Sequence, residues 1–293
     1  MTSTFTDSLE LSDGRHLDVY VSGTARGTPL ISHHGTPGSG MPGHQMERAA
    51  HARGLRLVTT SRPGYGTSSR HRGRRVADVV ADTAEVLAWL GADRCLTAGA
   101  SGGGPHALAC AARLEGVAGC LVIAGVAPYG GAGLDWMLGM GLENVKEFRA
   151  ALQSEGPLRT FLEATEGDFR TITAEGIIKA LATVLPEVDK AVLTDEFGDD
   201  TASSCREAVR TSVDGWLDDD LALVQPWGFE PSEVTVPTMI WQGDLDLMVP
   251  FTHGQWLASA FPHASAHLIP GEGHLSLAHG ALDAMLDELV AVL

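Results

Sequence analysis

The sequence predicts an α/β protein with a mostly parallel, eight-stranded sheet, helices on both faces and an inserted all-helical cap. Short, continuous apolar runs alternate with segments in which apolar residues recur at helical spacing. Continuous runs are typical of strands covered on both faces, and their alternation with helices indicates a parallel sheet. The alternation stops between Tyr129 and Pro226, where helix-like stretches occur without a convincing strand.

The first two strands are predicted to form a hairpin. Apolar and polar residues roughly alternate from Phe5 to Val21, and the turn residues Ser12-Asp13-Gly14 interrupt them. Six further strands are expected at 29–34, 55–60, 94–98, 119–124, 238–242 and 266–269. Helices are expected between them at 41–53, 76–90, 104–114, 252–260 and 275–293.

The insertion divides the chain into a core made of residues 1–128 and 227–293 and a cap made of residues 129–226. The chain carries a net charge of −17, which is made up of +2 in 1–128, −11 in 129–226 and −8 in 227–293. The simplest interpretation of the acidic cap is a solvated helical surface.

Composition excludes several classes of function. A pI near 5.0 argues against nucleic-acid binding, which needs clustered Lys and Arg. The longest largely apolar run, 117–128, is too short to cross a membrane, and the chain lacks a secretory signal pattern. Four widely spaced cysteines are expected to be buried thiols, and we expect a cytoplasmic protein of unknown oligomeric state.

A nucleophile is predicted at Ser101. It lies in Gly99-Ala100-Ser101-Gly102-Gly103, directly after a predicted strand and before a helix with Pro105 near its start. A serine at a sharp strand-to-helix turn needs glycines around it, because side chains there would collide. No acidic residue closes the following strand, so a dinucleotide-binding loop is not favoured.

An activated serine needs a histidine base and a carboxylate that orients the histidine. His274 directly follows the last predicted strand, in a glycine loop that can bring its ring towards Ser101. The preceding strand ends in Gly243-Asp244-Leu245-Asp246, which offers two candidate carboxylates.

No metal or other cofactor is expected. The cysteine and histidine spacings match no metal-binding motif, and His33 and His34 are predicted to point to opposite faces of a strand end.

The sequence resembles the α/β-hydrolase superfamily over essentially its whole length. Four motifs carry the resemblance: 33–38 after the third strand, 61–68 after the fourth, the turn at Ser101, and 243–250 together with Gly273-His274. The order Ser101, Asp246, His274 matches the family's arrangement. The resemblance also favours Asp246 over Asp244 as the carboxylate. The resemblance further implies that the backbone N–H groups of Thr36 and Gly102 form the oxyanion hole.

The same resemblance implies that the cap roofs the active site. Apolar cap residues and one core histidine are the candidate substrate-binding residues, namely His34, Trp136, Met137, Met140, Phe161 and Trp216, with Phe148 beside them. The arginine run 70–75 is interpreted as a solvated helix entrance, with an anionic substrate group or the acidic cap as alternative partners.

These features predict a serine hydrolase that cleaves a carboxylic ester, or an amide, of a small to medium apolar substrate. A lyase, cyclase or acyl transferase, or a ligand receptor with vestigial turnover, could use the same residues. Proline iminopeptidases are similar in the 37–38 motif and the helical cap, and Glu163, Glu166 or Asp168 could then bind a free amine. Thr36 and the small residues around Ser101 depart from their pattern, which disfavours peptidase activity.

Overall fold

The computed structural model describes residues 5–261 and 263–293. Its eight-stranded sheet has the order β1-β2-β4-β3-β5-β6-β7-β8. The strands are β1 (Phe5–Glu10), β2 (His16–Gly23), β3 (Pro29–His33), β4 (Arg56–Thr60), β5 (Cys95–Ala100), β6 (Val117–Ile123), β7 (Thr238–Gly243) and β8 (Ala264–Ile269). β2 is antiparallel to both β1 and β4, and the remaining neighbours are parallel.

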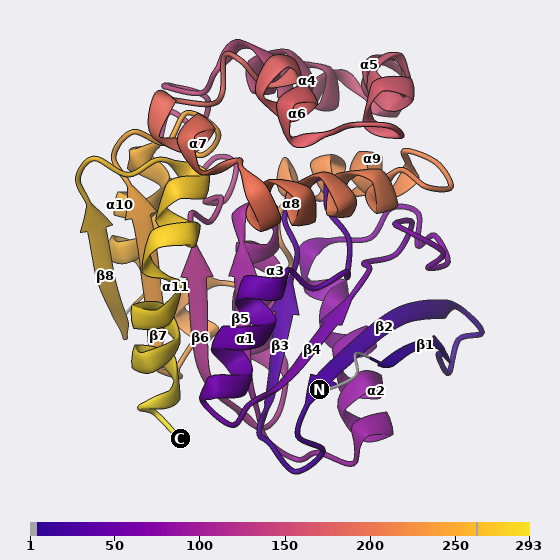
Figure 1. The fold of residues 1–293 in the computed structure, drawn as a ribbon, viewed down its shortest axis with the longest axis vertical. Helices are drawn as coiled ribbons and strands as arrows, with labels where there is room; N and C mark the ends of the chain where they lie inside the picture. The colour runs from indigo at the N-terminus through magenta and orange to yellow at the C-terminus, as the bar shows by residue number, and fades with distance from the viewer. Residues whose placement is uncertain (1–4, 262) are drawn as a thin grey trace.

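Helices cover both faces of the sheet (Figure 1). α1 (His44–Ala52) and α11 (His274–Val290) pack on one face, whereas α2 (Val79–Leu90), α3 (Gly104–Arg113) and α10 (Phe251–Ala260) pack on the other. Short 3-10 turns lie at Val76–Asp78, Ser101–Gly103 and Pro231–Glu233.

The central strands are apolar throughout because both of their faces are buried. Successive side chains of a strand point to opposite faces. In β6, Leu121 belongs to the same core cluster as Leu286 of α11, whereas Val122 belongs to the cluster of Leu108 in α3.

The cap consists of six helices inserted between β6 and β7, and it lies over the carboxyl ends of the parallel strands (Figure 1). They are α4 (Leu142–Gln153), α5 (Glu155–Phe169), α6 (Ala174–Ala180), α7 (Glu187–Val192), α8 (Asp195–Ala208) and α9 (Asp214–Leu223). Fully buried leucines such as Leu158, Leu162 and Leu217 form much of the cap's own core. The predicted fold class is confirmed, whereas the exact domain boundaries stay a prediction.

Two strands begin earlier than predicted. Val117 pairs with Cys95 at the start of β6, and Ala264 pairs with Thr238 at the start of β8. Pairing with a neighbouring strand therefore sets these starts, which apolar patterning alone does not reveal. Among the described helices, none has the length and apolar character needed to cross a membrane.

Candidate active site

Ser101 lies at the sharp turn between β5 and α3. Its φ is +55°, in the left-handed region that residues other than glycine rarely adopt. A Cβ at Gly99 would collide with the backbone of Gly103, and a Cβ at Gly103 would collide with the carbonyl of His33. The glycines on either side therefore permit a strained backbone that places Ser101 at the carboxyl end of the sheet.

The His274 ring at the start of α11 faces a carboxylate from the loop after β7. Its Nδ1 lies 2.7 Å from Asp246 Oδ2. The Asp246 side chain is buried and accepts hydrogen bonds from the side chain of Gln242 and from the N–H groups of Met248 and Val249. These bonds fix the carboxylate, which holds the His274 proton on Nδ1 and leaves Nε2 as the acceptor.

Asp244, the alternative carboxylate, points elsewhere. It is exposed, and its Oδ1 accepts the N–H of Gly271 at 2.7 Å. The structure thus brings Asp246, rather than Asp244, to His274.

The pKa of His274 is raised above its ordinary value of 6.5. Burial alone would lower this pKa, because desolvation disfavours the imidazolium ion, but the charge and the hydrogen bond of Asp246, together with the charge of Asp189, outweigh burial. Asp189 contributes a further, smaller increase in this pKa.

Asp189 is a residue that sequence reasoning missed. It belongs to cap helix α7, is fully buried, and accepts the N–H groups of His274, Leu275 and Ser276 at 2.8–2.9 Å. These are the unpaired donors at the N-terminus of α11, where a carboxylate is also favoured by the helix dipole. A cap residue therefore fixes the start of the helix that carries His274. In the sequence, Asp189 is one of many acidic cap residues, and no motif marks it as a partner of the helix that carries His274.

Thr36 and Gly102 meet beside Ser101. A Cβ at Gly102 would lie 3.4 Å from the backbone nitrogen of Thr36, and a Cβ at Gly35 would lie 3.4 Å from the Cβ of Ser101. Thr36, Gly102, Ser101 and His274 all line one cavity between the core and the cap.

A buried ion cluster lies next to the loop that carries Thr36, and its centre is Asp219 of cap helix α9. The carboxylate of Asp219 has no exposed surface. It accepts hydrogen bonds from Arg62 at 2.6 Å and from the Tyr65 hydroxyl at 2.8 Å, and Arg74 lies 2.7 Å away. Burial alone would raise the pKa of Asp219, but the two arginines outweigh it and hold this pKa well below its usual range.

The cluster also holds the backbone of the Thr36 loop. The Thr36 hydroxyl donates to Asp219 at 2.7 Å. Arg62 donates to the carbonyl oxygens of His34 and Gly35, in the latter case at 3.0 Å. The position of Thr36 therefore depends on an arginine of the core and an aspartate of the cap.

The cavity that Ser101 lines has a volume of about 400 Å³. Of the predicted substrate-binding residues, His34, Met140 and Trp216 line it, as does Phe148. Much of the remaining wall is apolar and includes Leu181, Val184 and Leu223.

The other predicted residues lie in packed cores. Trp136 is buried against Phe148, and its indole N–H donates to the carbonyl of Ala127 at 2.6 Å. Met137 packs against the same core cluster as Trp136, and Phe161 packs against the core of the cap. Helical spacing predicted that these apolar residues face inward. It could not show which of them pack into a core and which line the cavity.

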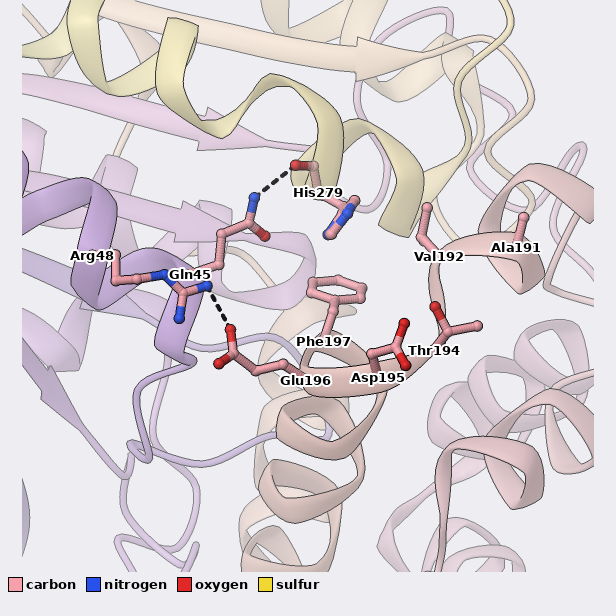
Figure 2. Close-up of a pocket in the computed structure, with 9 residues that line it drawn as sticks. All are labelled: Gln45, Arg48, Ala191, Val192, Thr194, Asp195, Glu196, Phe197 and His279. Carbon is pink, nitrogen blue, oxygen red and sulfur yellow. Dashed lines mark hydrogen bonds and ion pairs between the residues drawn. The ribbon is translucent and has the colours of Figure 1, made fainter.

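A second pocket of about 310 Å³ lies where α1, α8 and α11 meet, and Figure 2 shows its residues. An ion pair between Arg48 and Glu196 spans it from core to cap. Gln45 and Phe197 line both this pocket and the larger cavity, so the two adjoin each other.

The arginine run binds the acidic cap. Arg70 pairs with Asp218 at 2.8 Å, and Arg72 pairs with Glu155 at 2.7 Å. The interpretation as a solvated helix entrance is thus wrong for Arg70 and for the buried Arg74, and the alternative in which the run binds the acidic cap is correct for Arg70, Arg72 and Arg74. Arg75 is exposed.

His33 is buried, His34 is half-buried at the cavity wall, and both are neutral. Burial lowers the pKa of His33 to about 3 and that of His34 well below 6.5. His34 accepts the N–H of Arg62 on Nε2 and contacts the carbonyl of Gly35 through Nδ1. Across residues 5–261 and 263–293, no group of three potential ligands could hold a metal ion.

A family model of the α/β hydrolase fold matches residues 28–281. The chain belongs to the α/β-hydrolase fold family. No curated protein sequence matches it.

Solved structures of this hydrolase family resemble the chain over nearly its whole length. A hydrolase from Pseudomonas aeruginosa PA01 is 18% identical with a TM-score of 0.70, covering 97% of this chain and 98% of its own. A bromoperoxidase from Bacillus anthracis is 20% identical with a TM-score of 0.71 (99% and 100% covered). A thermophilic esterase from Thermogutta terrifontis is 19% identical with a TM-score of 0.64 (99% and 98% covered). At these identities the likeness shows the α/β-hydrolase fold alone.

Asp219→Asn should destabilise this hydrolase-fold protein strongly. The change leaves Arg62 and Arg74 buried without their counter-charge, and breaking a buried ion pair typically costs about 3–5 kcal/mol. Urea unfolding should show this loss in the free energy of unfolding. As a control, Glu196→Gln removes the exposed pair with Arg48 and should leave the urea midpoint near that of the wild type. An Asp219→Asn variant as stable as the wild type would contradict the role given to the cluster.

The His274 imidazole should titrate above its ordinary value of 6.5 in NMR spectra of the folded protein. Asp246→Asn should lower this pKa, because it removes the charge that stabilises the imidazolium, and Asp244→Asn should leave it unchanged. A raised folded pKa means that the His274–Asp246 pair stabilises the fold fully below 6.5 and that this contribution is lost as pH rises through the folded pKa. An unchanged His274 pKa in Asp246→Asn would overturn the pairing.

Proposed function

We propose that the protein is a serine hydrolase that cleaves a carboxylic ester of a small to medium apolar substrate through an acyl-enzyme on Ser101. The observation that carries the proposal is the strained backbone of Ser101 in one cavity with a His274 ring whose Nδ1 is held by Asp246. A serine that lines a cavity at such a turn and a histidine of fixed tautomer are what nucleophilic catalysis by serine requires.

In the proposed reaction, Nε2 of His274 takes the hydroxyl proton as Ser101 Oγ attacks the substrate carbonyl. The N–H groups of Thr36 and Gly102 stabilise the oxyanion, a contribution that is typically about 2.7–4 kcal/mol per donor. His274 then passes its proton to the leaving alcohol, and the acyl-enzyme remains. Water attacks the acyl group with His274 again as base, which releases the acid and restores Ser101. Asp246 stays ionised throughout.

The cavity supports an apolar acyl or alcohol group. Met140, Phe148 and Leu223 form part of its wall, and burial of such a group would remove its apolar surface from water. A volume of about 400 Å³ fits a small to medium molecule. Esterases are among the solved structures that share the fold. This likeness agrees with ester cleavage, but the proposal is based on the geometry of the site.

Ser101→Ala should abolish most turnover of short p-nitrophenyl esters. In comparable triads the loss of the nucleophile lowers kcat by about 10⁶-fold, because the covalent route is removed. Ser259→Ala, which changes an exposed serine of α10, is the matched control and should retain wild-type kcat and KM. Near-normal esterase activity in Ser101→Ala would refute Ser101 as the nucleophile.

A further inference from the structure

Three consecutive aspartates of cap helix α9 have different surroundings. Asp218 pairs with Arg70, and Asp219 pairs with Arg62 and Arg74. Asp220 has no such partner. It is fully buried, and neither carboxylate oxygen accepts a hydrogen bond from an N–H or hydroxyl group of the described residues.

Asp220 lies against a second carboxyl group, that of Glu147 in α4, and both line the cavity of Ser101. Glu147 accepts the indole N–H of Trp216 at 2.6 Å, a neutral donor that supplies no positive charge. Burial, followed by the charge of Glu147, raises the pKa of Asp220 well above its usual range. The pKa of Glu147 is raised as well, mainly by burial, so the two facing carboxyl groups hold a proton more readily than exposed ones do. Any negative charge that the pair carries has no positive side chain of the described residues beside it.

The rest of the cavity does not balance this charge. Among the described residues that line it, none is Lys or Arg. His274 already faces Asp246, and His34 is held neutral by burial. Asp200, the other carboxylate of the wall, is bound to His44 at 2.7 Å. A buried negative charge without a partner is costly, and a cation entering the cavity would relieve that cost.

We propose that the Glu147–Asp220 pair is a binding site for a protonated amine of the substrate. An ammonium group offers three N–H donors to the buried oxygens of Asp220, which have no donor of their own among the described residues, and one positive charge that would stabilise the ionised form of the pair. The apolar wall then holds the carbon chain between the ammonium group and the reacting carbonyl. This substrate class, an ester that carries an alkylammonium group, rests on the proposed function, whereas the cation site itself does not.

Isothermal titration of the full-length Ser101→Ala protein with n-hexylammonium chloride tests the site without turnover. Hexylammonium should bind about tenfold or more tightly than n-hexanol, its neutral counterpart, because hydrogen bonds to a charged acceptor are strong. Adding Asp220→Asn should remove this preference and leave the affinity for n-hexanol unchanged. The added amide has nearly the shape of a protonated Asp220, so the variant should fold. Glu147→Gln, the second variant, should likewise remove the preference for hexylammonium.

Asp200→Asn in the same background is the matched control. It neutralises another carboxylate of the same cavity, one that already has His44 as its partner. The preference for hexylammonium should survive this change. Equal binding of hexylammonium and n-hexanol to the Ser101→Ala protein, or a preference that persists in both Asp220→Asn and Glu147→Gln, would overturn the site.

Kinetics on two p-nitrophenyl esters extend the test to the substrate class. The wild-type protein should show a kcat/KM about tenfold or more higher for the ester of aminohexanoic acid than for the heptanoate ester. Asp220→Asn should equalise the two values by lowering only the first. If both esters are hydrolysed without this preference, the proposed substrate class is wrong, whereas the proposed serine hydrolase activity is supported. If hexylammonium binds but neither ester is hydrolysed, the proposed function is wrong, whereas the cation site at Glu147 and Asp220 is supported.

Discussion

The buried carboxylate of Asp219 joins the cap to the core, and the geometry around Ser101 depends on it. It balances the charges of two buried arginines and accepts the hydroxyl of Thr36. Arg62, which it holds, binds the carbonyls of the loop that ends at Thr36. Because a buried charge without its partner is costly, the cap, the arginines and the loop are stable only in this mutual arrangement.

A second cap carboxylate acts in the same way on the other side of the cavity. Asp189 holds the first three N–H groups of α11 and so fixes the helix that begins with His274. The cap therefore covers the cavity and also positions the residues around it. Asp219 holds the loop beside Ser101, and Asp189 holds the helix that carries His274. Part of the acidic charge of the cap therefore serves to join the cap to the core. Asp189 and Asp219 are buried, and Asp218 and Glu155 pair with arginines of the core.

The fold could be predicted from the sequence because its signals are local. A continuous apolar run such as that of β6 needs two covered faces, and a serine between glycines at a strand end needs the turn found at Ser101. Asp246 and Asp244 could not be separated by residues alone, since both follow the same strand. The bonds from Met248 and Val249, which turn Asp246 inward, form only in the folded loop.

Features that arise from packing within the cap, or between the cap and the core, could not be predicted. Asp189 and Asp220 are ordinary helix acids in the sequence, and their roles depend on which helix end or carboxyl group they meet after folding. The same limit applies to the apolar cap residues. Met140 and Trp216 reach the cavity while Trp136 and Phe161 pack into cores, although all four show inward helical spacing.

Intact-protein mass spectrometry after treatment with a fluorophosphonate measures most directly whether Ser101 is an activated nucleophile. One phosphonyl adduct should form, should map to the peptide that contains Ser101, and should be absent from Ser101→Ala. Its formation should be much slower in His274→Ala, because the hydroxyl proton then has no acceptor. An unlabelled wild-type protein, or an adduct on another residue, would contradict the role of Ser101.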